Sequence, residues 1–189
     1  MNPAHQAPLI LTLALADADQ ARFDRLRAQH FPPERNHIPA HLTLFHHPPG
    51  DAIDLVRGTI EACSQVAPFP VAVTGLRSLG RGVAFTLASP ELASLRRTLA
   101  QHWHADLTAQ DRQGFRPHIT IQNKVAPADA RALLAHLTAA FTPFEVQADG
   151  LNLWHYRGGP WEPAAQILFR APPEAPPGPH HRSPSSDPS

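Results

Sequence analysis

The feature that most constrains this chain is a short strand pattern that occurs twice. Residues 41–47 read HLTLFHH, and residues 118–124 read HITIQNK. Both begin with His-x-Thr-x in which each x is Leu or Ile, and alternate residues of a β-strand point to opposite faces of a sheet. Each segment is therefore predicted to be a strand with an apolar face in the core and a His and a Thr on the other face.

The segments around the two motifs follow the same order, which is strand, helix, motif strand, helix, strand. Strands are expected at residues 8–15, 41–46, 69–76, 83–88, 118–122, 143–154 and 164–170. Helices are expected at residues 17–30 with Asp17 or Asp19 as cap, after a cap at Asp51, from Ser89 onward, and from Pro127 onward.

The repeated order predicts an internal duplication with one half at about residues 8–76 and the other at about 83–154. Two such units would pack about a pseudo-twofold axis, with the matching strands facing each other across a central groove. The predicted fold class is therefore α+β, with two lobes, each an antiparallel sheet flanked by helices.

Two local patterns refine this organisation. In residues 143–154 the alternation of apolar side chains slips at Gly150, which predicts a β-bulge there. Residues 171–189 are rich in Pro and Ser and contain no large apolar residue, so they are expected to form a disordered tail. The predicted folded domain spans residues 1–170.

The composition excludes some classes of function and location. Sixteen basic residues balance sixteen acidic ones, so no long polyanion such as duplex DNA is indicated as a partner. The only cysteine, Cys63, has no partner for an internal disulfide, and no apolar run reaches the roughly 20 residues that span a bilayer. We expect a cytoplasmic protein with no membrane partner, no obligatory protein partner and a monomeric state.

Two imidazoles and two hydroxyls on one polar face suit the cleavage of phosphoesters without a metal. Imidazole titrates near pH 6.5, so one histidine can accept a proton from water while the other donates a proton to the leaving oxygen. Hydroxyl groups can donate hydrogen bonds to the non-bridging phosphate oxygens. The 13 histidines include no His-Glu-x-x-His helix or Cys/His cluster, so no metal site and no cofactor are predicted.

This pair of motifs resembles the 2H phosphoesterase superfamily, in particular the bacterial 2'-5' RNA ligases, also named RNA 2',3'-cyclic phosphodiesterases. The resemblance covers about residues 8–170, and each motif is closely preceded by a proline, Pro39 or Pro117. It implies an active site in the groove between two lobes. The catalytic set that it implies is His41, Thr43, His118 and Thr120, with the histidines catalytic and the threonines binding phosphate.

The resemblance also implies a substrate and a reaction. The substrate would be a cyclic nucleotide or an RNA end with a 2',3'-cyclic phosphate, which water opens to a phosphomonoester, and the reverse reaction would join ends through a 2'-5' linkage. In the family the first histidine is commonly described as the acid and the second as the base. The residues themselves leave that assignment open.

Three further residues are candidates for substrate contact. Phe45 continues the His41 face of a regular strand and could stack on a base, although packing at the strand end is an equally simple role. Lys124 continues the His118 face and could neutralise phosphate, or it is a surface lysine. Arg116, two residues before His118, could bind phosphate through paired donors, or it is a solvated loop residue.

Two other functions remain open. A non-catalytic protein could bind nucleotides or RNA ends in the same groove, although binding alone requires no pair of titratable groups. A metal-dependent hydrolase is the other alternative, and activity in excess chelator would exclude it.

Overall fold

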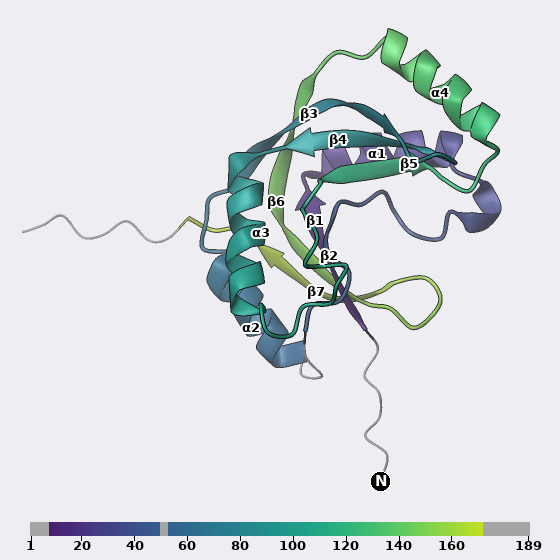
Figure 1. The fold of residues 1–189 in the computed structure, drawn as a ribbon. Coiled ribbons are helices and arrows are strands. Elements are labelled where there is room, and N and C mark those ends of the chain that lie inside the picture. Colours follow the sequence, from purple (N-terminus) through teal and green to yellow (C-terminus); the bar gives the residue numbers. More distant parts are fainter. Residues whose placement is uncertain (1–7, 50–52, 172–189) are drawn as a thin grey trace, which may run out of the picture.

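The computed structural model describes residues 8–49 and 53–171 (Figure 1). Its strands are β1 (Leu9–Leu15), β2 (Thr43–Phe45), β3 (Phe69–Ser78), β4 (Val83–Ala88), β5 (His118–Gln122), β6 (Phe144–His155) and β7 (Glu162–Leu168). Its helices are α1 (Asp17–His30), α2 (Ile53–Cys63), α3 (Pro90–His102) and α4 (Pro127–Ala139), with a short 3-10 helix at Pro33–Arg35. These elements confirm the predicted order of helices and strands.

The strands form an antiparallel sheet in the order β2-β1-β6-β3-β4-β5, and β7 also pairs with β6. The expected α+β class, an antiparallel sheet flanked by helices, is confirmed. The two expected sheets, however, are joined into one. The long strand β6 joins them, because its residues 144–148 pair with β3 and its residues 150–155 pair with β1 on one edge and β7 on the other.

An irregularity in β6 separates these two segments. Ala14 of β1 lies opposite Gly150, but the next residue, Leu15, lies opposite Ala148. The register therefore skips Asp149, whose carbonyl oxygen instead accepts a hydrogen bond from the Phe169 backbone N–H at 2.8 Å. This shift confirms the bulge predicted at Gly150 and lets one strand serve both parts of the sheet.

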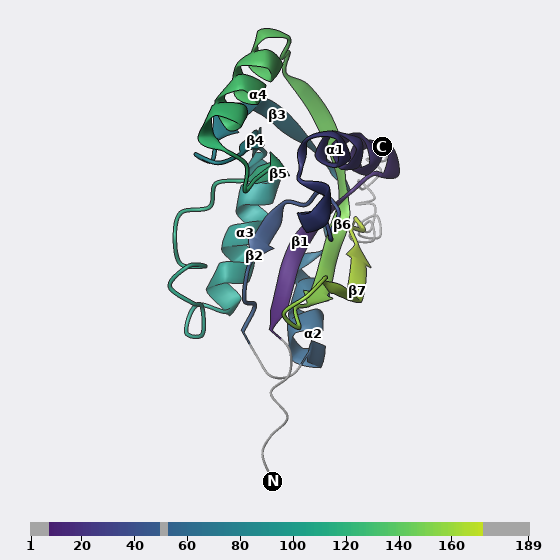
Figure 2. The same ribbon diagram turned by 90° about the vertical axis from the view of Figure 1, so that its right-hand side faces the viewer.

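The helices pack across the boundary between the two halves of the sequence. Helix α1 contacts β5, and α4 contacts β3, whereas α2 packs on α3 and touches β7. Figures 1 and 2 show α1 and α4 at one end of the molecule and α2 at the other. The first helix of the chain therefore supports the second motif strand.

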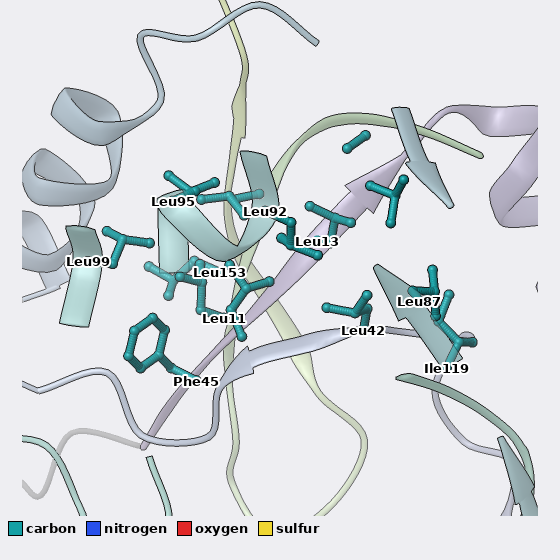
Figure 3. Packing of buried hydrophobic residues seen from close by; sticks show 14 of the residues in the cluster. Leu11, Leu13, Leu42, Phe45, Leu87, Leu92, Leu95, Leu99, Ile119 and Leu153 are labelled. Carbon is teal, nitrogen blue, oxygen red and sulfur yellow. The ribbon is translucent and has the colours of Figure 1, made fainter. Parts of the chain in front are cut away.

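One apolar core connects these layers. Figure 3 shows leucines of β1, β6 and α3 packing together with Leu42 and Phe45 of the first motif segment, with Ile119 of the second close by. Leu42 and Ile119 are each 1% exposed, which confirms that the residue after each motif histidine points into the core. Burial of such side chains stabilises the fold by about 1.5–3 kcal/mol each.

The N-caps of α1 and α3 agree with the sequence predictions in one case and differ in the other. The Ser89 hydroxyl oxygen accepts a hydrogen bond from the Leu92 backbone N–H at 3.2 Å, so Ser89 caps α3 as predicted. The predicted cap of α1 at Asp17 or Asp19 is wrong, because the N-cap is Ala16 and makes no side-chain cap. The Asp19 carboxylate instead accepts the Gln147 backbone N–H at 2.8 Å, tying α1 to β6.

Two other expectations concern residues beyond these elements. The cap predicted at Asp51 lies outside the described residues, as does the predicted tail from residue 172 onward. Within the described residues, no helix is both long enough and apolar enough to cross a membrane.

Candidate active site

The two motif strands are the terminal strands of the sheet path, β2 at one end and β5 at the other. The sheet curves so that these strands approach each other, as both ribbon views show (Figures 1 and 2). A cavity of about 490 Å³ lies between them and is lined by Thr43 from β2 and His118 from β5. The fold thus brings the two His-x-Thr motifs to one site from opposite ends of one sheet.

The two histidine rings are held in the same way. The Nδ1 atom of His41 lies 2.8 Å from the carbonyl oxygen of Pro39, and Nδ1 of His118 lies 2.8 Å from that of Arg116. A carbonyl oxygen can only accept a hydrogen bond, so each Nδ1 carries the proton of its contact. In each ring the Nε2 atom is left to accept or donate a proton elsewhere.

His41 lies beside the cavity rather than in its lining. Its ring packs on the indole of Trp161 at a centroid distance of 4.5 Å. Burial lowers the pKa of His41 to about 4, against a raising effect of the Pro39 carbonyl, and the charges of Arg27 and His118 lower it further. His41 is therefore neutral at neutral pH before any ligand binds.

The other predicted groups divide between the cavity and its surroundings. Thr43 and Arg116 line the cavity with His118. Thr120 is half-buried on β5, opposite Ala84 of β4, and its carbonyl oxygen accepts a hydrogen bond from Arg27 Nη1 at 2.9 Å. The structure therefore brings Thr43, Arg116 and His118 into one cavity, with His41 beside it.

The candidate role of Phe45 in stacking on a base is wrong. In the pairing of β1 with β2, Leu11 lies opposite Phe45 and the next residue, Thr12, lies opposite Thr43. Leu44 is therefore an extra residue in β2, and the alternation after it is reversed. Phe45 is fully buried, in edge contact with Trp103 at a centroid distance of 4.9 Å.

The prediction that Lys124 continues the His118 face is also wrong. Strand β5 ends at Gln122, which is buried, and the chain then turns with Lys124 at a φ of 64°. This left-handed conformation breaks the two-residue period of the strand. Lys124 is exposed and does not belong to the cavity lining.

Two buried arginines, which the sequence analysis missed, support the motif strands. Arg27 of α1 donates to the Thr120 carbonyl of β5, and Arg96 of α3 donates through Nε to the Leu44 carbonyl of β2 at 2.8 Å. A terminal strand has carbonyl groups without a neighbouring strand, and the guanidinium groups satisfy them. Residues four positions apart lie on the same face of a helix. Arg27 follows the buried Phe23 by four positions and Arg96 follows the buried Leu92 by four, so this spacing could have indicated that both arginines face the core.

Asp111 is a further residue of the cavity lining. Its carboxylate accepts the backbone N–H groups of His46 at 2.9 Å and of His47 at 2.8 Å, and lies 3.4 Å from the His46 ring. Burial alone would raise the pKa of Asp111, but these hydrogen bonds outweigh it and the pKa is lowered. Asp111 thus fixes the end of β2 to the loop that precedes β5.

Within residues 8–49 and 53–171, no three His, Cys, Asp or Glu side chains are grouped so that they could hold a metal ion.

Solved structures share this fold. The protein TT0787 of Thermus thermophilus matches with a TM-score of 0.63 at 16% identity, covering 87% of this chain and 98% of the other. E. coli LigT complexed with 3'-AMP matches with a TM-score of 0.53 at 18% identity, covering 87% and 98%. The complex of LigT with NADP+ gives a TM-score of 0.51 at 18% identity, with the same coverage. Among curated proteins, none matches this sequence.

The sequence itself provides the assignment to a family. The model of the 2'-5' RNA ligase superfamily matches residues 15–160, a span that includes β2, β5 and both motif histidines. Since that span is most of the chain, the protein belongs to the 2'-5' RNA ligase superfamily of 2H phosphoesterases.

Proposed function

We propose that this protein hydrolyses a 2',3'-cyclic phosphate at a nucleotide or RNA end to a phosphomonoester, without a metal ion. The observation that carries the proposal is that both imidazole rings are held by the same hydrogen bond. Each Nδ1 is bound to the carbonyl oxygen two residues before it, and each Nε2 is free for proton transfer beside one cavity. In support, solved structures of E. coli LigT are complexes with phosphate, 3'-AMP and ATP.

In the proposed reaction the oxygen of a water molecule forms a bond to phosphorus, and the bond from phosphorus to one ribose oxygen breaks. One imidazole accepts the proton that the water loses, and the other donates a proton to the leaving ribose oxygen. The hydroxyls of Thr43 and Thr120 donate hydrogen bonds to the non-bridging oxygens, where charge is stabilised in the transition state. A 5'-hydroxyl in place of water would give 2'-5' joining by the same steps: its oxygen forms the bond to phosphorus, the bond to the 3' oxygen breaks, and the two imidazoles move the protons as before.

We assign His41 as the proton acceptor in hydrolysis and His118 as the donor. The lowered pKa of His41 leaves its Nε2 unprotonated over the neutral range, whereas a proton donor must begin protonated. This assignment reverses the order commonly given for the family. The pH profile of kcat/KM reports the groups of the free enzyme, so its acid limb should lie near pH 4 rather than near 6.5.

The test is an assay with nucleoside 2',3'-cyclic phosphates in excess chelator. We expect turnover, and a loss of at least about 100-fold in kcat for His41→Gln and for His118→Gln. The matched control is His136→Gln, on the exposed surface of α4, which should retain full activity. Full activity in both motif variants, with unchanged circular dichroism, would contradict the proposal, and binding without turnover would favour the non-catalytic alternative.

A further inference from the structure

The cavity beside the motif histidines contains more positive charge than one phosphate requires. Besides Thr43 and His118, its lining includes three arginines and a second histidine, His46. The single acidic residue in the lining is Asp111. The reacting phosphate already has the two catalytic imidazoles and the threonine hydroxyls as partners, so the remaining cationic side chains need another explanation.

One of the three arginines is already used within the fold. The Arg96 guanidinium is buried, donates to the carbonyl oxygens of Leu44 and Asp111, and lies 3.6 Å from the centre of the Phe45 ring. Burial lowers its pKa, with Asp111 opposing that effect. Arg96 is therefore a structural residue, and it also provides the charge that balances the Asp111 carboxylate at the wall of the cavity.

Arg77 and Arg116 differ from Arg96, because among the residues that the structure describes neither of their side chains makes a hydrogen bond or an ion pair, whereas Arg96 donates to two carbonyl oxygens. Arg116 is exposed at the mouth of the cavity, and Arg77 is half-buried near the end of β3. The Asp111 carboxylate is 2% exposed and holds two backbone N–H groups, so it is not oriented to pair with either. Both guanidinium groups are free to bind an anion.

The strand register places Arg77 on the catalytic face of the sheet. Arg77 of β3 lies opposite Ala84 of β4, and Ala84 lies opposite Thr120 of β5. Residues directly opposite each other in neighbouring strands share a face, so the three side chains point to the same side. Because the alanine between them is small, the long Arg77 side chain can extend over it toward the groups that hold the reacting phosphate.

We propose that Arg77 and Arg116, with His46 in the same cavity lining, form a subsite for a second phosphate of the substrate. The inference rests on the proposed function, since the first phosphate is the cyclic one at the motif histidines. Guanidinium groups match phosphate oxygens with paired donors, which suits the phosphate on the 5' oxygen of the same nucleotide. That phosphate is a monoester in a 5'-phosphorylated mononucleotide and a diester in an RNA chain.

The experiment compares three substrates that share the cyclic phosphate. These are a nucleoside 2',3'-cyclic phosphate with a free 5'-hydroxyl, the same compound with a 5'-phosphate, and a dinucleotide that ends in a cyclic phosphate. We expect kcat/KM to be at least about tenfold higher for one or both substrates with the second phosphate. Preference for the 5'-phosphate identifies a nucleotide site, and preference for the dinucleotide identifies an RNA site.

The variant Arg77→Gln tests the residue assignment. It should lower the ratio of kcat/KM between the preferred substrate and the one-phosphate substrate by about tenfold, and Arg116→Gln should do the same. The matched control is Arg131→Gln, an equal change of charge at an exposed position of α4, which should leave the ratio unchanged. Added salt should lower the ratio in the wild type and have less effect in Arg77→Gln.

The outcomes separate this inference from the proposed function. Turnover of all three substrates at equal kcat/KM would overturn the second subsite and leave the proposed function intact. If no cyclic phosphate is turned over, the proposed function fails, and calorimetry with a nucleoside 3'-monophosphate and a nucleoside 3',5'-bisphosphate then tests the subsite alone. Equal affinity of the wild type for these two ligands would overturn the second subsite. The same would follow if the second phosphate raised the affinity of Arg77→Gln as much as that of the wild type.

Discussion

The Nη1 atom of Arg27 lies 2.9 Å from the carbonyl oxygen of Thr120, so the first helix of the chain holds the second motif strand. The same guanidinium donates through Nε to the Asn36 side chain and to the Ile38 carbonyl, just before His41. Arg27 is 4% exposed. One buried cation therefore fixes the polypeptide segments that carry both motif histidines.

Replacing Arg27 by Met should destabilise the protein by about 2–4 kcal/mol, because the methylenes remain but three part-buried acceptors lose their donor. Urea denaturation followed by circular dichroism measures the change. The control is Arg25→Met on the exposed side of α1, which should stay within about 0.5 kcal/mol of the wild type. Equal stability of the two variants would show that the Arg27 contacts contribute nothing net.

The Trp161 indole should control the protonation of His41. The two rings lie 4.5 Å apart, and burial is the largest cause of the lowered pKa of His41. We expect Trp161→Ala to admit water and raise the pKa of His41 from about 4 toward its usual 6.5. An NMR titration of the His41 ring protons measures it, with Tyr156→Ala in the same loop as control, and an unchanged value in Trp161→Ala would contradict the prediction.

The same histidine should make the protein less stable in acid. The pKa of His41 is about 4 in the folded state and near 6.5 in the unfolded state, so the unfolded state binds more protons between these values. Stability from this group is complete above pH 6.5 and falls as the pH is lowered toward 4. Between pH 7.5 and pH 5 the contribution of His41 to the free energy of unfolding should fall by at most about 2 kcal/mol, since the ring is partly exposed to solvent.

The measurement for this effect is the free energy of unfolding of the wild type and of His41→Gln at pH 7.5 and pH 5. Glutamine does not titrate, so the difference between the two proteins should shift in favour of the variant at the lower pH. A difference that is the same at both pH values would show that His41 titrates alike in the folded and unfolded states.

Two glycines should respond in opposite directions to substitution by alanine. Gly58 lies within α2 with open space where a Cβ would stand, so Gly58→Ala should stabilise the protein by about 0.5–1 kcal/mol. At Gly150 a Cβ would overlap the backbone carbonyl of Ile167 in β7, so Gly150→Ala should destabilise it by more than about 2 kcal/mol. Thermal unfolding of both variants tests the pair, and a stabilised Gly150→Ala would show that β7 can move away.

The parts of the site that could be predicted from the sequence are those set by local periodicity. The side chains of a strand alternate between its two faces whatever the neighbouring strands are. The sequence alone therefore predicted that Leu42 and Ile119 point into the core, on the face opposite to that of the motif His and Thr residues. The bulge near Gly150 followed for the same reason, since a slip in alternation is visible in one segment.

The parts that could not be predicted depend on partners far along the chain. The reversal at Phe45 arises from the pairing of β2 with β1, and nothing between residues 41 and 47 indicates the extra residue. Trp161 lies in a loop rich in Gly and Pro, where no period places a side chain. Arg77 shares a face of the sheet with Thr120 only through the register of three strands, which one sequence does not supply.

The position of β6 also bears on the order in which the protein can fold during synthesis. This strand lies between β1 and β3, yet its residues 144–155 emerge from the ribosome after both neighbours and after both motif histidines. Until then β1 and β3 have no strand between them to hold them together. The two motif histidines can therefore come together only when most of the polypeptide has been made, so a nascent chain that stops before β6 should lack the candidate site.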